Sequence, residues 1–461
     1  MMAYRRVAGA NWRGVVETAR ETPPPPNGRK SVTRRPNLRM HVMSRSEAGQ
    51  LALNGGPKTC KTPWPPRRLF TEKEKRAVIA LFDASIASGE AIGYNGPEEE
   101  NYCKEFAHFL GGGYADGVNS GSSAVYVALR ALKVKAFSEV VCGPVSDPGG
   151  IMPIPLAGCI PIPADAEPGS FNMSPRSLAR RITKRTGAIV VAHIAGLPAE
   201  MEPILDLAKA KGIPVVEDCA QTHGAKYHGK YCGTWGDVGA FSTMFGKHHV
   251  TGGQGGLVFT KSEEMYWQIR RCADRGKPFN LTGTAGNVLA AHNMNLNDLS
   301  ACIGRVQLKK LPGILAARRR SARWLIEACR SELKSVRIVD APPRSEGVYW
   351  FLLVQLDLAK LSANKETFVK ALAAEGVPCD SSYLHLFSDH DWYRNRNVFE
   401  GTTYPWTAPL YKGDPAREYP VPNIRATDKY TFQMFWNERV TRPVAGQVLD
   451  ALKKVEQAYL A

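Results

Sequence analysis

The sequence has no apolar run long enough to cross a bilayer, and none of its ten cysteines forms a C-x-x-C pair. Its start also lacks the apolar core that a secretory signal needs. These absences argue against a membrane-spanning protein and against a disulfide-bonded secreted one. Several cysteines lie in apolar segments, which indicates reduced, buried thiols in a cytoplasmic protein.

Acidic residues are scarce at the start of the chain. Residues 1 to 45 contain ten Lys or Arg and only two Glu, so nearly half of the formal charge of +17 lies there. With four consecutive prolines at 23–26, this composition predicts a disordered basic tail over residues 1–48. An organellar transit peptide and a translation start at Met43 are two other interpretations of the same segment.

The rest of the chain is only moderately basic, which suits an anionic substrate or cofactor. No zinc-finger, basic-zipper or aromatic RNA-binding pattern accompanies the charge, so we expect no nucleic-acid partner. A nucleic-acid-binding protein is the alternative from a different functional class. It requires the chain without its basic tail to remain strongly basic.

The length of 461 residues and the order of the segments predict a large domain over 49–311 and a smaller α+β domain over 312–461. Short β-branched runs alternate with amphipathic segments, which indicates a mostly parallel sheet covered on both faces. Helices are predicted at 122–132, 200–212 and 299–311, and strands at 139–145, 187–196, 213–220, 238–244, 256–260 and 349–357.

Ligands of such sheets bind beyond the carboxyl ends of the strands, so polar residues after each apolar run are the first candidates. Asp218, Ser242 and Lys247 occupy such positions. Lys247 lies in FSTMFGKHHVTGGQGG, where its amine can approach a carbonyl cofactor if the surroundings lower its pKa. A solvated loop lysine is the ordinary alternative. A phosphate-binding P-loop is excluded, because Phe241 and His248 stand where it needs glycine and Ser or Thr.

Asp218 and Gln221 lie in VVEDCAQTHGA, directly after an apolar strand. A carboxylate at a buried strand end needs a cationic partner, and a protonated pyridine nitrogen is one candidate. A helix N-cap is the alternative. In NSGSSAVYVAL, a glycine turn and small hydroxyl residues precede a helix, whose free N–H groups suit a phosphate. The candidate phosphate-binding residues are Gly121, Ser122, Ser123 and, from the later strand, Ser242.

Ordered motifs from residue 51 to the end resemble the DegT/DnrJ/EryC1/StrS sugar aminotransferases, a family of fold-type I pyridoxal-phosphate enzymes. The resemblance is strongest between 90 and 311, through YNGPEEENYCKEFAHFLG, VNSGSSAVYVAL, VVAHIAGLPAEMEPI, VVEDCAQTHGA, FSTMFGKHHVTGGQGG and HNMNLNDLSACIGRVQLKKL. It implies a three-layer α/β fold of the aspartate-aminotransferase-like kind with a smaller C-terminal α+β domain.

By this resemblance Lys247 is similar to the Schiff-base lysine, Asp218 to the partner of the pyridine nitrogen, and Gln221 to a neighbour of the cofactor ring. Asn293 matches an asparagine that reaches the phosphate of the neighbouring subunit in the family, which implies a homodimer with shared active sites. The residues that the resemblance assigns to the cofactor phosphate are Gly121, Ser122 and Ser242.

Two positions depart from the family pattern. Asp147, in GPVSDPG, stands where the family usually has an aromatic residue that stacks on the cofactor, and Asn295 replaces a common arginine. Cofactor stacking and substrate anchoring are therefore expected to differ. No metal site is predicted, because the spacing of the likeliest ligands is not that of a metal site; these ligands are His193, His248 and His249.

The resemblance implies transfer of an amino group from glutamate or glutamine to a keto-sugar, commonly one linked to a nucleotide. Keto-cyclitols and aminobenzoate-type precursors are alternative acceptors. A dehydratase branch of the family carries histidine in place of the lysine, so Lys247 favours transamination. A cofactor-binding regulatory homologue is the alternative without enzymatic activity.

Overall fold

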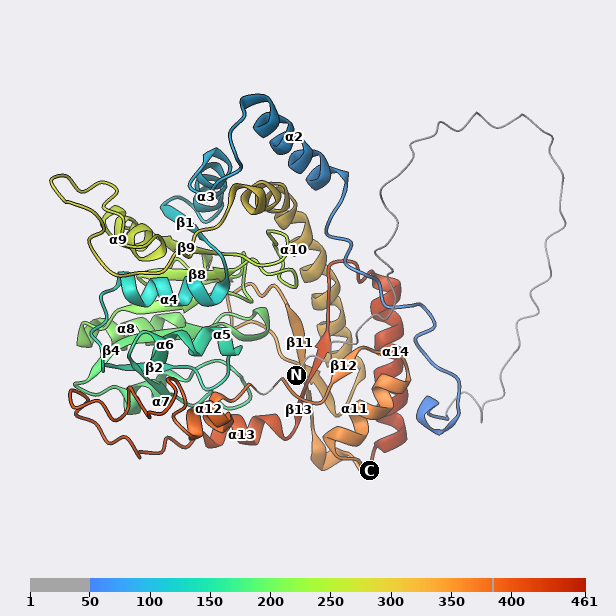
Figure 1. Cartoon of the computed structure of the whole chain (residues 1–461). Helices are drawn as coiled ribbons and strands as arrows, with labels where there is room; N and C mark the ends of the chain where they lie inside the picture. Colours follow the sequence, from blue (N-terminus) through green and yellow to red (C-terminus); the bar gives the residue numbers. More distant parts are fainter. Residues whose placement is uncertain (1–49, 384) are drawn as a thin grey trace, which may run out of the picture. The chain divides into compact units, whose positions relative to one another are not determined.

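The computed structural model describes residues 50–383 and 385–461 (Figure 1). The predicted disordered tail over 1–48 lies outside these residues. Within the described part of the chain, no helix combines the length and the apolar character needed to cross a bilayer. All ten cysteines are free thiols, and nine of them are buried.

A seven-stranded sheet forms the N-terminal part of the fold, in the order β1-β9-β8-β5-β4-β2-β3. Only β9 runs antiparallel to its neighbours, so the sheet is mostly parallel, as the sequence predicted. Every residue of β5 and β8 is buried, which shows that both faces are covered. The strands are β1 (Tyr114–Val118), β2 (Glu139–Cys142), β3 (Ile160–Pro163), β4 (Thr186–Ala192), β5 (Val215–Asp218), β8 (Val238–Ser242) and β9 (Gly256–Thr260).

Helix α4 packs on β8, β9 and α9, and α3 contacts β1. The helices of this part are α2 (Glu72–Ser88), α3 (Pro97–Phe109), α4 (Gly121–Ala131), α5 (Pro148–Ile151), α6 (Pro153–Leu156), α7 (Pro175–Arg181), α8 (Met201–Lys211) and α9 (Glu263–Ala273). A small hairpin, β6 (Lys226–Tyr227) and β7 (Lys230–Tyr231), and 3₁₀ turns at Ala52–Asn54 and Ile194–Gly196 complete it.

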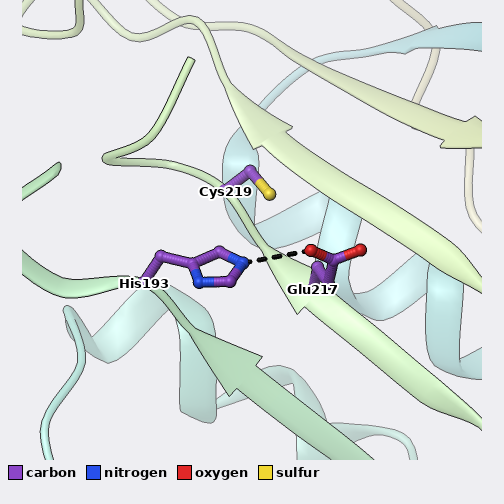
Figure 2. Close-up of side chains that lie close together, drawn as sticks. All are labelled: His193, Glu217 and Cys219. Atoms are coloured by element: carbon purple, nitrogen blue, oxygen red, sulfur yellow. Dashed lines mark hydrogen bonds and ion pairs between the residues drawn. The ribbon is translucent and has the colours of Figure 1, made fainter. Parts of the chain in front are cut away.

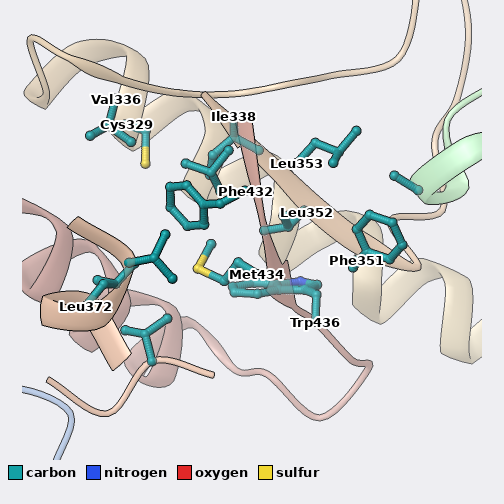
Figure 3. Packing of buried hydrophobic residues seen from close by; sticks show 14 of the residues in the cluster. Cys329, Val336, Ile338, Phe351, Leu352, Leu353, Leu372, Phe432, Met434 and Trp436 are labelled. Carbon is teal, nitrogen blue, oxygen red and sulfur yellow. The ribbon is translucent and has the colours of Figure 1, made fainter. Parts of the chain in front are cut away.

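A second, four-stranded antiparallel sheet follows, in the order β10-β11-β13-β12. Apolar side chains from its strands, from Cys329 and from Leu372 pack together to form its core (Figure 3). The elements are β10 (Val336–Ile338), β11 (Phe351–Leu356), β12 (Cys379–Asp380), β13 (Thr431–Phe435), α11 (Lys365–Ala374) and α14 (Arg442–Tyr459), with a 3₁₀ turn at Leu358–Lys360.

Helix α10 (Asp298–Glu332) runs through the predicted boundary near residue 312 without a break, with Pro312 inside it. Near its start Arg305 pairs with Glu98 of α3, and at its end Glu332 pairs with Lys453 of α14. One helix is therefore shared by the elements around both sheets (Figure 1). The division into domains 49–311 and 312–461 stays a prediction.

The segment between β12 and β13 returns to the seven-stranded sheet. Val145 and Leu386 form an isolated antiparallel bridge, and the Tyr411 hydroxyl donates to Glu139 at the start of β2 (3.2 Å). This segment contains a 3₁₀ turn (Phe387–Asp389), α12 (Asp391–Arg394) and α13 (Pro422–Asp428). It brings Tyr383 and His385 from the smaller sheet to the strand ends of the larger one.

Candidate functional site

The candidate site lies at the edge where the parallel strands of the larger sheet end. Asp218 is the last residue of β5, and Ser242 is the last residue of β8. Strand β1 ends at Val118, and the chain then turns at Ser120, the N-cap of α4. The structure thus brings the predicted residues from three strand ends to one edge.

Lys247 follows β8 in a tight turn in which its N–H donates to the carbonyl of Met244 (2.9 Å). Its side chain is only 4% exposed, and Nζ lies 4.0 Å from the centroid of the Trp350 ring. Within the described residues, Nζ makes no hydrogen bond or ion pair. Burial lowers the pKa of Lys247, and the carboxylates of Asp147 and Asp218 act against that shift. The solvated loop lysine is therefore excluded.

Asp218 is buried, and one of its carboxylate oxygens, Oδ1, accepts the N–H of Ala220 (3.0 Å). Burial raises the pKa of Asp218, and the Ala220 hydrogen bond and the charge of Lys247 lower it. A Cβ atom on Gly150 would lie 2.4 Å from the other oxygen, Oδ2, so only glycine fits there. No donor from residues 50–383 or 385–461 reaches Oδ2, and a buried carboxylate with such an oxygen suits a protonated ring nitrogen.

Gln221 connects two segments at the site. Its Oε1 accepts the N–H of Ala195 (2.7 Å), and its Nε2 donates to the hydroxyl of Tyr383 (2.7 Å). Ala195 has a left-handed backbone, with φ of 61°. Both ends of the Gln221 amide are thus occupied by protein groups, which fixes the side chain beside Asp218.

The start of α4 forms a cradle of small residues. A Cβ atom on Gly121 would lie 2.6 Å from Cβ of Ser242, and one on Gly149 would lie 2.4 Å from Oγ of Ser122. The Ser120 hydroxyl accepts the N–H of Ser123 (3.0 Å), whereas Ser122 is exposed. The free N–H groups of the first turn and the nearby hydroxyls suit a phosphate.

Asn293 lies on the surface, away from the carboxylates of the site. Its Oδ1 accepts hydrogen bonds from the backbone N–H and the side-chain amide of Asn295, and the next residue, Met294, accepts the N–H of Asn119. It is therefore an exposed residue beside the segment that leads into α4.

Asp147 lies in the position where the family has an aromatic ring. Its carboxylate caps α5 by accepting the N–H of Gly149 (3.0 Å). Its charge also acts on Lys247, and it raises the pKa of Tyr383 and counteracts the burial that lowers the pKa of His385. Trp350 and Tyr383, which pack edge-to-face against each other, supply aromatic rings near Lys247.

His193, Glu217 and Cys219 have ligand atoms within 4.8 Å of one another (Figure 2). His193 Nδ1 accepts the N–H of Ala199 (3.0 Å), so Nε2 carries the proton and donates to Glu217 (3.1 Å). The Glu217 carboxylate also accepts three backbone N–H groups, from Gly233, Trp235 and Gly236. Because the nitrogens and the carboxylate are already engaged, this cluster does not fit a metal ion.

His248 and His249, which follow Lys247, are fully buried. Burial lowers the pKa of both imidazoles, to about 4 for His249. Their Nε2 atoms lie within hydrogen-bonding distance of the carbonyls of Val348 and Gly304. These are neutral histidines of the protein interior.

Three residues that contact the site were not indicated by any motif in the sequence. Trp350 and Tyr383 come from the part of the chain after α10, and Arg67 comes from the segment before α2. Trp350 starts the apolar stretch that predicted β11, and nothing local distinguishes it from a core residue.

The family model described as the DegT/DnrJ/EryC1/StrS aminotransferase family matches residues 72–413. GDP-perosamine synthase of Escherichia coli O157:H7 is 31% identical over 254 residues, which are 55% of this chain and 67% of that protein. L-glutamine:scyllo-inosose aminotransferase of Streptomyces griseus is 29% identical over 341 residues, 70% of this chain and 78% of that protein.

The X-ray structure of the aminotransferase from Psychrobacter cryohalolentis superposes with a TM-score of 0.73 and 26% identity. The superposition covers 86% of this chain and 99% of the Psychrobacter chain. The predicted fold-type I architecture is thereby confirmed. The buried lysine, the buried carboxylate and the cradle at α4 fit pyridoxal phosphate. The chain belongs to the DegT/DnrJ/EryC1/StrS family of pyridoxal-phosphate-dependent aminotransferases.

Proposed function

We propose that this chain moves an amino group from glutamate or glutamine to a keto-sugar, with Lys247 as the lysine that carries the cofactor. The observation that supports this most directly is the buried amine of Lys247, close to the carboxylate of Asp218. A buried amine with a lowered pKa is a nucleophile and can also carry a proton.

Pyridoxal phosphate, when bound, supplies a carbonyl for the amino group and a ring that withdraws electrons. Asp218 would keep the ring nitrogen protonated, with Gln221 as a neighbour of the ring. Lys247 would take a proton from the α-carbon of the amino donor. In the second half of the reaction it would give a proton to the carbon of the acceptor that receives the amino group. The residues that would hold the phosphate are Gly121, Ser122 and Ser242, with Asn293 of a second subunit.

The relatives suggest two classes of acceptor. One carries the name of a GDP-linked amino sugar and the other that of scyllo-inosose, a keto-cyclitol. We propose a nucleotide-linked keto-sugar first, because the moderately basic chain suits an anionic substrate, and a keto-cyclitol as the alternative. A dehydratase is disfavoured by the lysine at position 247.

The test uses the cofactor-loaded protein in two reactions followed by mass spectrometry. In one, L-glutamine or L-glutamate is mixed with scyllo-inosose; in the other, GDP-perosamine is mixed with 2-oxoglutarate to run the transfer backwards. Amino-group transfer in either reaction is expected, as is its loss in Lys247→Ala but not in Lys309→Ala, a change at an exposed lysine of α10. Equal turnover by Lys247→Ala would contradict the assignment, and absence of transfer with any acceptor would favour a regulatory homologue.

We also propose a homodimer with shared sites. Helix α2 exposes three large apolar side chains at helical spacing, Ile79, Phe82 and Ile86, the last 77% exposed. Asn293 is exposed as well and is available to a second subunit. Light scattering is expected to give twice the chain mass, and Ile86→Asp is expected to shift the protein toward the monomer. A monomeric wild type would contradict the proposal.

We also propose a cytoplasmic location, which the free and mostly buried thiols support.

A further inference from the structure

Trp350 contacts the side chain of Lys247 and also the residue directly before it. Its ring centroid lies 4.0 Å from Nζ, and its indole N–H donates to the carbonyl of Gly246 (3.3 Å), directly before the lysine. One side chain from the smaller sheet thus contacts both the ammonium and the turn that presents it.

The backbone of Trp350 is itself fixed. Its N–H donates to the carbonyl of Ala195 (3.0 Å), and its carbonyl accepts from Nη1 of Arg318 (3.4 Å). A Cβ atom on Gly196 would lie 2.6 Å from the Trp350 nitrogen, so the two segments are in close contact. The ring packs edge-to-face against Tyr383, at 6.1 Å between centroids. Because its backbone and its ring are fixed, Trp350 can restrict the position of the Lys247 side chain.

The turn that carries Lys247 is also held from its other side. Nη1 of Arg67 donates to the carbonyls of Gly246 (2.9 Å) and Lys247 (2.7 Å). Arg67 pairs with Glu438 (3.0 Å), which also pairs with the buried Arg318. Because the main chain is fixed, the remaining freedom of the lysine lies in its side chain.

The charge on that side chain has few partners. The titratable groups whose charge acts on Lys247 are Asp147 before α5 and Asp218 at the end of β5. The pKa of His223, in the loop after β5, is lowered by burial first and also by the charge of Lys247. Among the described residues, none makes a hydrogen bond to Nζ. A buried ammonium without hydrogen bonds is costly, and the negative face of an indole ring compensates part of that cost.

We propose that Trp350 is a positioning residue for Lys247, seating the ammonium on its ring whenever the lysine is free and fixing the turn through its indole N–H. The proposal rests on the proposed function, in which Lys247 alternates between a bound and a free state.

The test measures the pKa of Lys247 in the full chain freed of cofactor. Competitive labelling with acetic anhydride across a pH series, with the Lys247 peptide quantified by mass spectrometry, gives that pKa directly. In Trp350→Leu the pKa is expected to fall by roughly half a unit to one and a half units, the worth of a cation–π contact. Trp350→Phe keeps a ring face but not the N–H, so a smaller fall is expected. Trp324→Leu is the matched control, because its ring lies against Arg442.

The second readout is the single-turnover reaction of the loaded enzyme with glutamate. In Trp350→Leu the acidic limb of its rate profile is expected to move to lower pH with the pKa of Lys247, and Trp350→Phe is expected to restore it in part. An unchanged pKa in Trp350→Leu, or an equal fall in Trp324→Leu, would overturn the proposal. A wild type without transamination in which the pKa still falls would overturn the proposed function alone. If Trp350→Leu does not fold, the pKa of Trp350→Phe and Trp350→His decides.

Discussion

Asp218 is buried, yet among the described residues only one of its oxygens has a donor, the N–H of Ala220. If it holds a ring nitrogen protonated, Asp218→Asn replaces that charge with a neutral group of the same shape. We expect the single-turnover rate with glutamate to fall about 10²-fold or more, as when one electrostatic contact is removed from an active site. Cofactor binding is expected to persist through the cradle at α4. Asp237→Asn, at an exposed residue directly before β8, is the control, and an equal loss there would contradict the assignment.

Asp147 departs from the family pattern, and its carboxylate changes the electrostatics of the site. Its carboxylate acts to raise the pKa values of Lys247, Tyr383 and His385. Asp147→Asn should therefore lower all three. Competitive labelling of Lys247 and NMR titration of His385 measure whether these two pKa values fall. Unchanged values for both would mean that solvent screens the carboxylate.

Local sequence was enough to place Asp218, Ser242 and Lys247 at one edge of the sheet, because Asp218 ends β5, Ser242 ends β8 and Lys247 follows β8. It could not find Trp350, whose partner Gly246 is 104 residues away, or Tyr383, which is 162 residues from Gln221. Such contacts depend on how the two sheets meet, which no short window of sequence describes. Shared sites through Asn293 stay a prediction for the same reason.

At the scale of elements, α4 and β8 meet where a phosphate is expected. A Cβ atom on Gly121 would lie 2.6 Å from Cβ of Ser242, so Gly121→Ala must displace one of the two. Overpacking of this kind costs about 1–3 kcal/mol, and we expect the Kd for pyridoxal phosphate to rise roughly 5- to 100-fold. Fluorescence titration measures it. Gly446→Ala in α14, where nothing lies within 4 Å of the new Cβ, is expected to leave the Kd unchanged.

The predicted elements differ from the observed ones where proline intervenes or where a helix continues. The strand predicted over 139–145 ends at Cys142, before Gly143 and Pro144, because proline cannot donate to a sheet. The short helices α5 and α6, each beginning with proline, were not predicted. The helix predicted over 299–311 continues to Glu332, and its later turns carry Arg318, which pairs with Glu438 beyond β13.

For the whole molecule, the site is complete only when both sheets are in place. Trp350 and Tyr383 reach it from the smaller sheet, and the ion pairs of Glu438 with Arg67 and Arg318 join the Lys247 turn to β13 and α10. Folding of the second half of the chain and formation of the site are therefore one event, and unfolding should remove both together.

Acid is expected to destabilise this arrangement through its buried histidines, His223, His248 and His249, whose pKa values burial lowers. In the unfolded chain each takes up a proton near pH 6.5, whereas folded His249 does so only at about 4. Between these values the unfolded state binds more protons, so stability is full above about pH 6.5 and falls as the pH drops toward 4.

Glu99 acts in the opposite direction, because burial raises its pKa to about 8 and its folded form gains protons first as the pH falls. The histidine contribution must therefore be isolated by comparison with His249→Phe. The stability advantage of wild type over this variant should shrink by up to about 3 kcal/mol between pH 6.5 and 4, measured by urea unfolding. A constant difference would show that folding does not lower the pKa of His249. Glu99→Gln, compared in the same way, should show a difference of opposite sign.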